Sequence, residues 1–400
     1  MRSVPGQAAD PASPAAPRPA APPESPVDEL RVASGSIVAY RLFDIAYAID
    51  LPAAERLWAR QSRAWSTRAR LSTAPAKAVA FGVPPVELAL APVAMQLGTA
   101  RLTANVVARL YEFGVVTFAL HVPASDLPWS AYVALTDQVD RCLRGGDGGA
   151  DTAPWAGLLA EIRRIFADAL VRPAATTIEE DYLIALVHSF GEELTAEALQ
   201  RRIDLVPLLS GDRRALSEAA RQDVLRLRFS YYADDLVVLT WDRAFIYEPR
   251  RDSDVADVLE VANAQLVEMR YYDALLDAEL PRMYDLIEST QRSARLLASR
   301  RFADLARRLS GLVAEVTELT EKVDNALKVT EDVYLARVYA AALDQFRVPT
   351  FGAAVDRKLA IIRDTYAGLY QEASAARAAL MEAVIVLLIA VEIVLALLRP

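Results

Sequence analysis

Short apolar runs bounded by turn residues dominate the first 250 residues of the chain. The segment Ser34–Ala48 is rich in β-branched and aromatic side chains, which is typical of β-strands. Pro52 opens a helical pattern that continues to Trp65, since proline suits the first turn of a helix. The same reading predicts strands over 78–81, 86–90, 101–110 and 115–121, and helices over 128–143 and 155–171.

A second group of elements begins at Ile178. A strand is predicted over 181–190, a helix follows Thr195 as its N-cap, and a hairpin turns at Trp241–Arg243. In both groups a tyrosine-containing segment leads into an apolar strand and then into a helix. The sequence therefore predicts an α+β fold with two ferredoxin-like α+β units, residues 28–150 and 151–250.

Residues 251–377 are predicted to form a helical, coiled-coil-like region, because apolar side chains recur there at spacings of three and four. The first stripe comprises Phe302, Leu305, Leu309, Leu312, Val316, Leu319 and Val323. The second stripe comprises Val355, Leu359, Ile362, Tyr366, Leu369, Ala373, Ala376 and Leu380. We expect a long helical hairpin whose stripes pack either within one chain or against further copies of it.

The second stripe continues into the apolar segment Ala378–Leu398, which we expect to be a transmembrane helix. Twenty-one residues of helix span roughly 31 Å, the thickness of a hydrocarbon core. Leu, Ile and Val side chains favour insertion by roughly 4 to 7 kcal/mol, against about 3 kcal/mol for a buried carboxylate such as Glu392. A buried helix of a soluble bundle is the alternative. The expected location is the cytoplasmic membrane, with a single tail-anchored span and the bulk of the chain in the cytoplasm.

Small side chains mark one seam of this last helix. Ala383 and Ala390 continue the heptad phase and would let neighbouring helices approach closely. Glu392 lies off that seam, where it would be protonated, reach the interface, or face a partner or pore. We therefore expect a homo-oligomer that contacts membrane lipid and a further protein partner that the sequence does not identify.

Composition narrows the remaining functional classes. The 400 residues carry a net charge of −9, and their short arginine pairs are interleaved with acids, which argues against nucleic-acid binding. The single cysteine, Cys142, permits no intramolecular disulfide, as is usual in a reducing compartment. Residues 1–27 are rich in proline and alanine and are predicted to be a disordered tail.

No motif for catalysis or for a cofactor is recognisable, so we predict no catalytic, cofactor-binding or metal-binding residues. The two histidines, His121 and His188, each close a predicted strand, where a structural role is the simpler reading. Acidic clusters occur at 179–181 and at Asp234–Asp235. They leave open a metal-dependent enzyme as an alternative function, although solvated turns explain them too.

Three segments of the C-terminal half resemble the required-for-meiotic-nuclear-division (Rmd, sporulation-protein) family. They are Glu268–Asp277, with the sequence EMRYYDALLD, then Asp356–Tyr370, and Ile389–Ile393 with its glutamate. The resemblance covers residues 178–400 and suggests a bacterial member of this domain-of-unknown-function group. It implies a membrane-bound oligomeric scaffold without an established enzymatic activity.

The resemblance also supplies candidate residues for oligomer or membrane contacts. These are Arg270, Tyr271, Tyr272 and Asp273 of the first segment, with Ala383, Ala390 and Glu392 of the last helix. A membrane-anchored oligomeric scaffold or tether is therefore the function that we predict. An enzyme of the α+β units and an ion-conducting or membrane-remodelling assembly are the alternatives.

Overall fold

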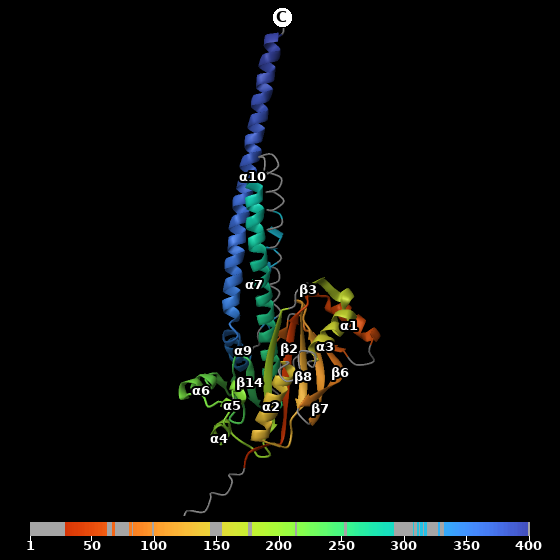
Figure 1. Cartoon of the computed structure of the whole chain (residues 1–400), viewed down its shortest axis with the longest axis vertical. Helices are drawn as coiled ribbons and strands as arrows, with labels where there is room; N and C mark the ends of the chain where they lie inside the picture. Colours follow the sequence, from red (N-terminus) through yellow and green to blue (C-terminus); the bar gives the residue numbers. More distant parts are fainter. Residues whose placement is uncertain are drawn as a thin grey trace, which may run out of the picture.

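The structure is a computed structural model that describes residues 29–61, 66–68, 80–81, 83–97, 100–144, 154–174, 178–212, 214–251, 254–291 and 332–398, with a few positions between 307 and 328. Two parts are evident in Figure 1: a mixed α+β head, built from residues up to 251, and a stalk that projects from it. The stalk consists of α7 (Val255–Gln291) and α10 (Val348–Leu398), and α9 (Val333–Gln345) lies at its base.

A nine-stranded sheet forms the centre of the head, in the order β12-β13-β14-β11-β2-β8-β7-β6-β4. Its strands are β2 (Ser34–Asp44), β4 (Ser66–Arg68), β6 (Val86–Leu97), β7 (Ala100–Leu110), β8 (Val115–Pro123), β11 (Glu179–Ser189), β12 (Arg228–Phe229), β13 (Leu236–Leu239) and β14 (Arg243–Tyr247). Six further short strands form two-stranded pairs: β1 (Arg31–Val32), β3 (Ala46–Ile49), β5 (Ala80–Phe81), β9 (Leu127–Pro128), β10 (Leu170–Pro173) and β15 (Leu327–Lys328).

The central strand pairs join the two halves of the head. β2 pairs antiparallel with β8 on one side and with β11 on the other, while β11 and β14 run parallel. Strands from both predicted units, 28–150 and 151–250, therefore share one continuous sheet. The α+β class is as predicted, and the hairpin of β13 and β14 lies where the sequence placed it.

Both faces of this sheet are buried, so its central strands are apolar at successive positions rather than at alternate ones. In β2, Ile37 and Ala39 belong to one core cluster, whereas Val38 and Tyr40 belong to the other. The helices on the first face are α1 (Leu51–Gln61), α2 (Trp129–Leu143), α3 (Trp155–Ile165), α4 (Ala196–Arg202), α5 (Val206–Ser210) and α6 (Glu218–Val224). The opposite core contains residues of α7, α9 and the lower part of α10.

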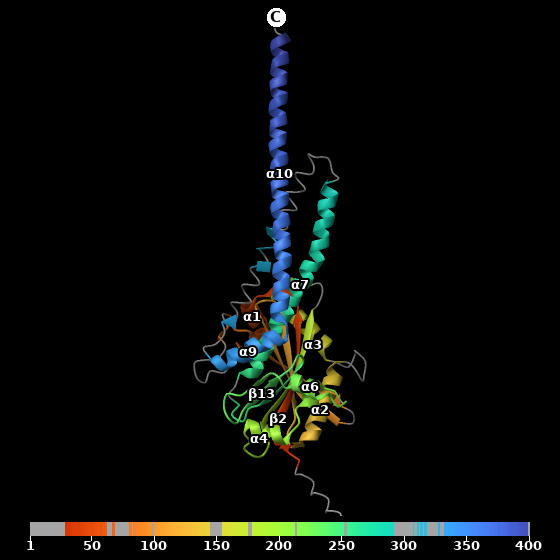
Figure 2. The same cartoon turned by 90° about the vertical axis from the view of Figure 1, so that its left-hand side faces the viewer.

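The stalk confirms part of the helical prediction. α7 and α10 lie side by side near the head, as both views show (Figures 1 and 2), and Val355, Leu359 and Ile362 of the second stripe are buried. Among the first stripe, only Val316 lies within the described residues, and it is buried as well. α7 continues through Pro281 without ending there.

The predicted transmembrane helix is wrong. Within the residues that the structure describes, no helix combines the length and the apolar content needed to cross a membrane. The uninterrupted apolar run of α10, from Glu382 to Glu392, holds only nine residues, or about 14 Å of helix against a core of about 30 Å. From the sequence we had expected the apolar residues outside this run to offset the insertion cost of the two carboxylates. The predicted tail-anchored topology and cytoplasmic-membrane location depended on that span, so they are wrong as well.

Candidate functional site

Four candidate residues, Arg270–Asp273, belong to the segment Glu268–Asp277, which we call the Rmd-like segment. They lie where the stalk meets the head. Arg270 of α7 forms an ion pair with Glu180 of β11, and its guanidinium also donates to the backbone carbonyl of Glu179 at 3.4 Å. Arg270 thus ties the helix to a central strand of the sheet. The two tyrosines that follow it are in ring contact, with their centroids 5.6 Å apart.

The other two residues of this segment point in different directions. Tyr272 is fully buried, and its hydroxyl donates to the carboxyl of Glu268 one turn earlier in α7. Asp273 instead faces α10, where its carboxylate accepts from the ammonium of Lys358 at 2.7 Å. The same ammonium lies 2.6 Å from the carboxylate of Asp277. The Rmd-like segment therefore holds α7 against both the sheet and α10.

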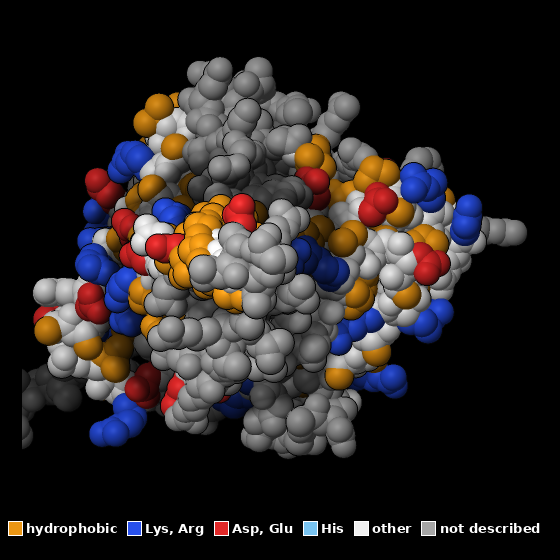
Figure 3. Space-filling view, turned by 90° about the horizontal axis from the view of Figure 1, so that it is seen from above, with side chains coloured by type: hydrophobic (Ala, Val, Ile, Leu, Met, Phe, Trp, Pro, Cys, Tyr) orange, Lys and Arg blue, Asp and Glu red, His pale blue; other side chains and the backbone are white. Residues whose placement is uncertain are grey.

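The candidate residues of the last helix lie at the far end of α10, away from the head. Ala383, Ala390 and Glu392 are all exposed. Figure 3 looks down on this end, and hydrophobic side chains are visible around it. The exposed large hydrophobic residues there are Met381, Val384, Ile385, Val386, Leu387, Leu388, Ile389, Val391, Ile393 and Val394. We call the segment Met381–Val394 the apolar tip.

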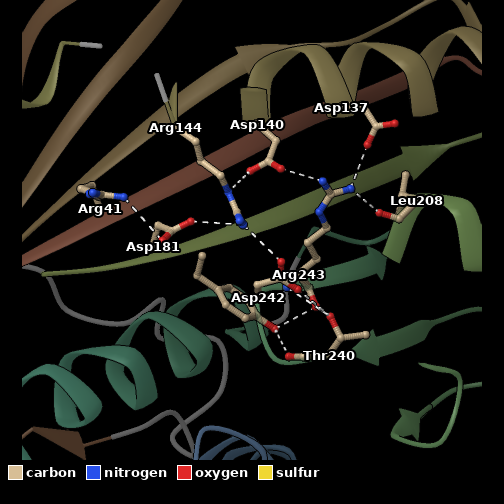
Figure 4. Close-up of polar contacts among 10 residues, drawn as sticks. Arg41, Asp137, Asp140, Arg144, Asp181, Leu208, Thr240, Asp242 and Arg243 are labelled. Atoms are coloured by element: carbon tan, nitrogen blue, oxygen red, sulfur yellow. Dashed lines mark hydrogen bonds and ion pairs between the residues drawn. The ribbon is translucent and has the colours of Figure 1, made fainter. Parts of the chain in front are cut away.

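A second site, which the sequence did not reveal, is centred on Arg243 at the start of β14 (Figure 4). Its side chain is only 6% exposed. The guanidinium donates to Asp137 at 2.9 Å, to Asp140 at 2.7 Å and to the carbonyl of Leu208 at 2.8 Å. Arg243 thereby connects the sheet to α2 and α5.

The same network extends across the sheet through alternating charges. Arg144 donates to Asp140 at 2.8 Å and lies 3.2 Å from both Asp181 and Asp242. Asp181 in turn lies 3.5 Å from Arg41. Every carboxylate of this chain of contacts has a guanidinium beside it. The arrangement therefore fixes α2 over β11 and β14 without leaving a bare buried charge among these residues.

A groove of about 630 Å³ opens between α2 and the segment 204–221, and Asp137 of the network lies in its wall. Arg141 and Arg221 also line it, together with Asp204 and apolar side chains such as Val133. Arg221 and Asp204 already pair with each other at 3.2 Å. The groove is thus of mixed polarity, and its two signs of charge are balanced.

Sequence reasoning missed the Arg243 network because its members are separated by up to about 200 positions. The only local signal was Trp241–Arg243, which we had taken as a hairpin turn. Gly211 is a further member that the sequence does not reveal. Its φ is +62°, and a Cβ at this position would lie 2.5 Å from the guanidinium of Arg243.

The residues that we considered for metal binding or nucleophilic chemistry do not form a cluster in the part of the chain that the structure describes. Among the described residues, no three His, Cys, Asp or Glu side chains are grouped as a metal site. Nδ1 of His188 forms a hydrogen bond of 3.2 Å with the backbone carbonyl of Glu248. Asp235 accepts from two backbone amides of its own loop. Burial raises the pKa of the Cys142 thiol, which disfavours the reactive thiolate.

Comparison with known proteins places the match on the head. The family described as "Uncharacterized protein MJ0711, N-terminal domain" matches residues 34–254, which end where the stalk begins. The Methanocaldococcus jannaschii protein named "Uncharacterized protein MJ0711" is 26% identical over 198 residues, or 48% of this chain. The chain spans 58% of that relative's length. No solved structure matches significantly. The resemblance to the Rmd family is not tested by these matches and stays a prediction.

Proposed function

We infer that this chain, which belongs to the family described as the MJ0711 N-terminal domain, is a homo-oligomeric scaffold. Copies would associate through the apolar tip of α10, and each copy would present its α+β head at the opposite end. The single observation that carries this proposal is the exposure of the tip. Its ten large hydrophobic side chains are between 43% and 63% exposed.

Exposure of this extent calls for a partner surface. A helix that is apolar on all sides is normally buried, and contiguous exposed apolar patches mark interaction sites. Complete burial of one Leu, Ile or Val side chain contributes about 1.5–3 kcal/mol. A second copy of the chain supplies a tip of the same length and chemistry, so identical tips can cover one another along their whole length.

Two further features fit a scaffold. The heptad stripe of α10 continues into the tip, and Ala383 and Ala390 lie on one seam where helices can approach closely. Arg270 ties α7 to the head, and Asp273 ties α7 to α10, so association at the tip would fix the spacing of the heads. The coiled-coil helical hairpin belongs to the same proposal, with α10 as its associating arm.

The test compares the size of the full chain with that of Leu387→Lys by light scattering after gel filtration. We expect the unaltered chain to be oligomeric, and the variant to dissociate at a concentration at least about tenfold higher, because an ammonium cannot be buried in an apolar seam. Tyr284→Lys, a similar change at a 54% exposed side chain of α7, is the matched control and should leave the size unchanged.

Two outcomes contradict the proposal. The first is a full chain that stays monomeric at every concentration. The second is an oligomer that Leu387→Lys leaves intact, which would move the contact away from the tip.

A further inference from the structure

Asp44, the last residue of β2, has a buried carboxyl group that accepts no hydrogen bond among the described residues. It is 1% exposed, and among the described residues neither carboxyl oxygen has a hydrogen-bond partner. Native proteins rarely leave buried polar atoms unsatisfied, and such an atom calls for an explanation. Asp44 lies on the sheet beneath the stalk, since α7 packs across β2.

A second carboxyl from the stalk lies in the same buried region. Glu268 of α7 is 2% exposed. One of its oxygens accepts from the hydroxyl of Tyr272, and the other, Oε2, has no partner among the described residues. The two carboxyls are close enough for the charge of Asp44 to act on Glu268 and on Tyr272. Three unsatisfied carboxyl oxygens thus gather where head and stalk meet.

The charges near this pair oppose the effect of burial only in part. Arg163 of α3 is the cation that acts on Asp44, and Tyr271 is the further titratable neighbour of Tyr272. Burial raises the pKa of Asp44 to about 7, with Arg163 opposing the rise. Burial also raises the pKa of Glu268 well above its ordinary value, and the charge of Asp44 raises it further. Both carboxyls therefore favour their neutral forms.

We propose that Asp44 and Glu268 form a proton-dependent latch between the head and the stalk. Both carboxyls hold a proton while α7 is seated on β2. Above neutral pH Asp44 loses its proton, and its charge then lies in a site without solvent near the carboxyl of Glu268. The seating of α7 is weakened as a result, and the segment around Glu268 opens. The latch does not depend on self-association at the apolar tip.

The direction of the pH effect follows from proton binding. In the unfolded chain both carboxyls titrate near pH 4, whereas in the folded chain they keep their protons to higher pH. Between about pH 4 and pH 7 the folded state therefore binds more protons, and its stability falls as pH rises. Each retained proton changes the unfolding equilibrium constant by about tenfold per pH unit in this window.

The experiment follows hydrogen exchange of the full chain by mass spectrometry from pH 5 to pH 9, after correction for intrinsic exchange. We expect amides of α7 around residues 262–276 to open as pH passes neutrality. Asp44→Asn should remove most of that pH dependence, because a neutral amide keeps the shape and cannot ionise. Glu268→Gln should reduce it, because the charge of Asp44 then has no second carboxyl to act on. Asp285→Asn, an exposed carboxyl of the same helix, should change nothing.

Infrared spectroscopy provides a test that needs no stable variant. We expect a protonated-carboxyl band in the unaltered full chain at pH 6 that weakens toward pH 9. The latch is overturned if no such band exists at pH 6. It is equally overturned if both variants fold and α7 opens with the same pH profile as in the unaltered chain.

Discussion

At the scale of single residues, the Arg243 network depends on one backbone conformation as much as on charge. Gly211 ends α5 in the left-handed region, and its missing side chain leaves room for the guanidinium of Arg243. Glycine adopts positive φ without the steric cost that a Cβ brings. Asp137 and Asp140 are placed one turn apart on α2, so both can reach the same arginine.

We expect Gly211→Ala to destabilise the head by about 1–3 kcal/mol, because a Cβ would meet both a positive φ and the buried guanidinium. Gly157→Ala is the matched control. Gly157 lies in α3 with no neighbouring atom within 4 Å of the added Cβ, so alanine should stabilise it by about 0.5–1 kcal/mol. Denaturant unfolding of both variants measures the difference. Equal stabilities would show that the loop at residue 211 can rearrange.

At the scale of elements, α10 changes its surroundings along its length. Near the head its stripe residues Val355, Leu359 and Ile362 are buried, and Lys358 reaches across to α7. In the apolar tip the described side chains are exposed. A single heptad pattern thus runs from contacts within the chain to a surface that calls for contacts between chains.

The two alanines on the seam of the apolar tip allow a test of how tightly the proposed oligomer associates. Replacing Ala383 and Ala390 together by Ile should weaken the oligomer by about tenfold or more, because bulkier side chains force the helices apart. Ala378→Ile is the matched control, since five residues of helix turn it about 140° from Ala383. Analytical ultracentrifugation over a concentration series measures both. Equal effects of the seam and control variants would exclude a seam through these alanines.

At the scale of the whole molecule, one sheet carries helices on one face and the base of the stalk on the other. The family match to residues 34–254 covers the head, and the apolar tip lies at the opposite end of the molecule (Figure 1). Head and tip are thus separate surfaces. A scaffold requires such a separation, because its association surface must leave the presented surface free.

The chemistry of the tip predicts how association responds to salt. Apolar burial is not screened by ions, whereas exposed ion pairs weaken as ionic strength rises. We expect the dissociation constant to stay within about threefold between low and high sodium chloride, and to fall in ammonium sulfate, which strengthens apolar burial. Light scattering at several salt concentrations measures this. A large increase of the dissociation constant with sodium chloride would point to charged contacts elsewhere.

The sequence by itself determined the class of the fold, most strand and helix positions, and the second heptad stripe. These features depend on local periodicity, which the order of residues records directly. It also marked the Rmd-like segment, although not its contacts. The transmembrane helix was predicted wrongly. The sum of the insertion free energies of the apolar side chains did not take into account how short the run between Glu382 and Glu392 is.

The tertiary structure alone decided how distant residues meet. The joining of both halves through β2 and β11 depends on long-range pairing that no local pattern encodes. The meeting of Arg243 with Asp137, and of Asp44 with Glu268, depends on which helix covers which face of the sheet. Polar side chains carry no periodicity that announces such partners. Burial then raises the pKa of Asp44 and of Glu268, because desolvation depends on the folded surroundings rather than on neighbours in sequence.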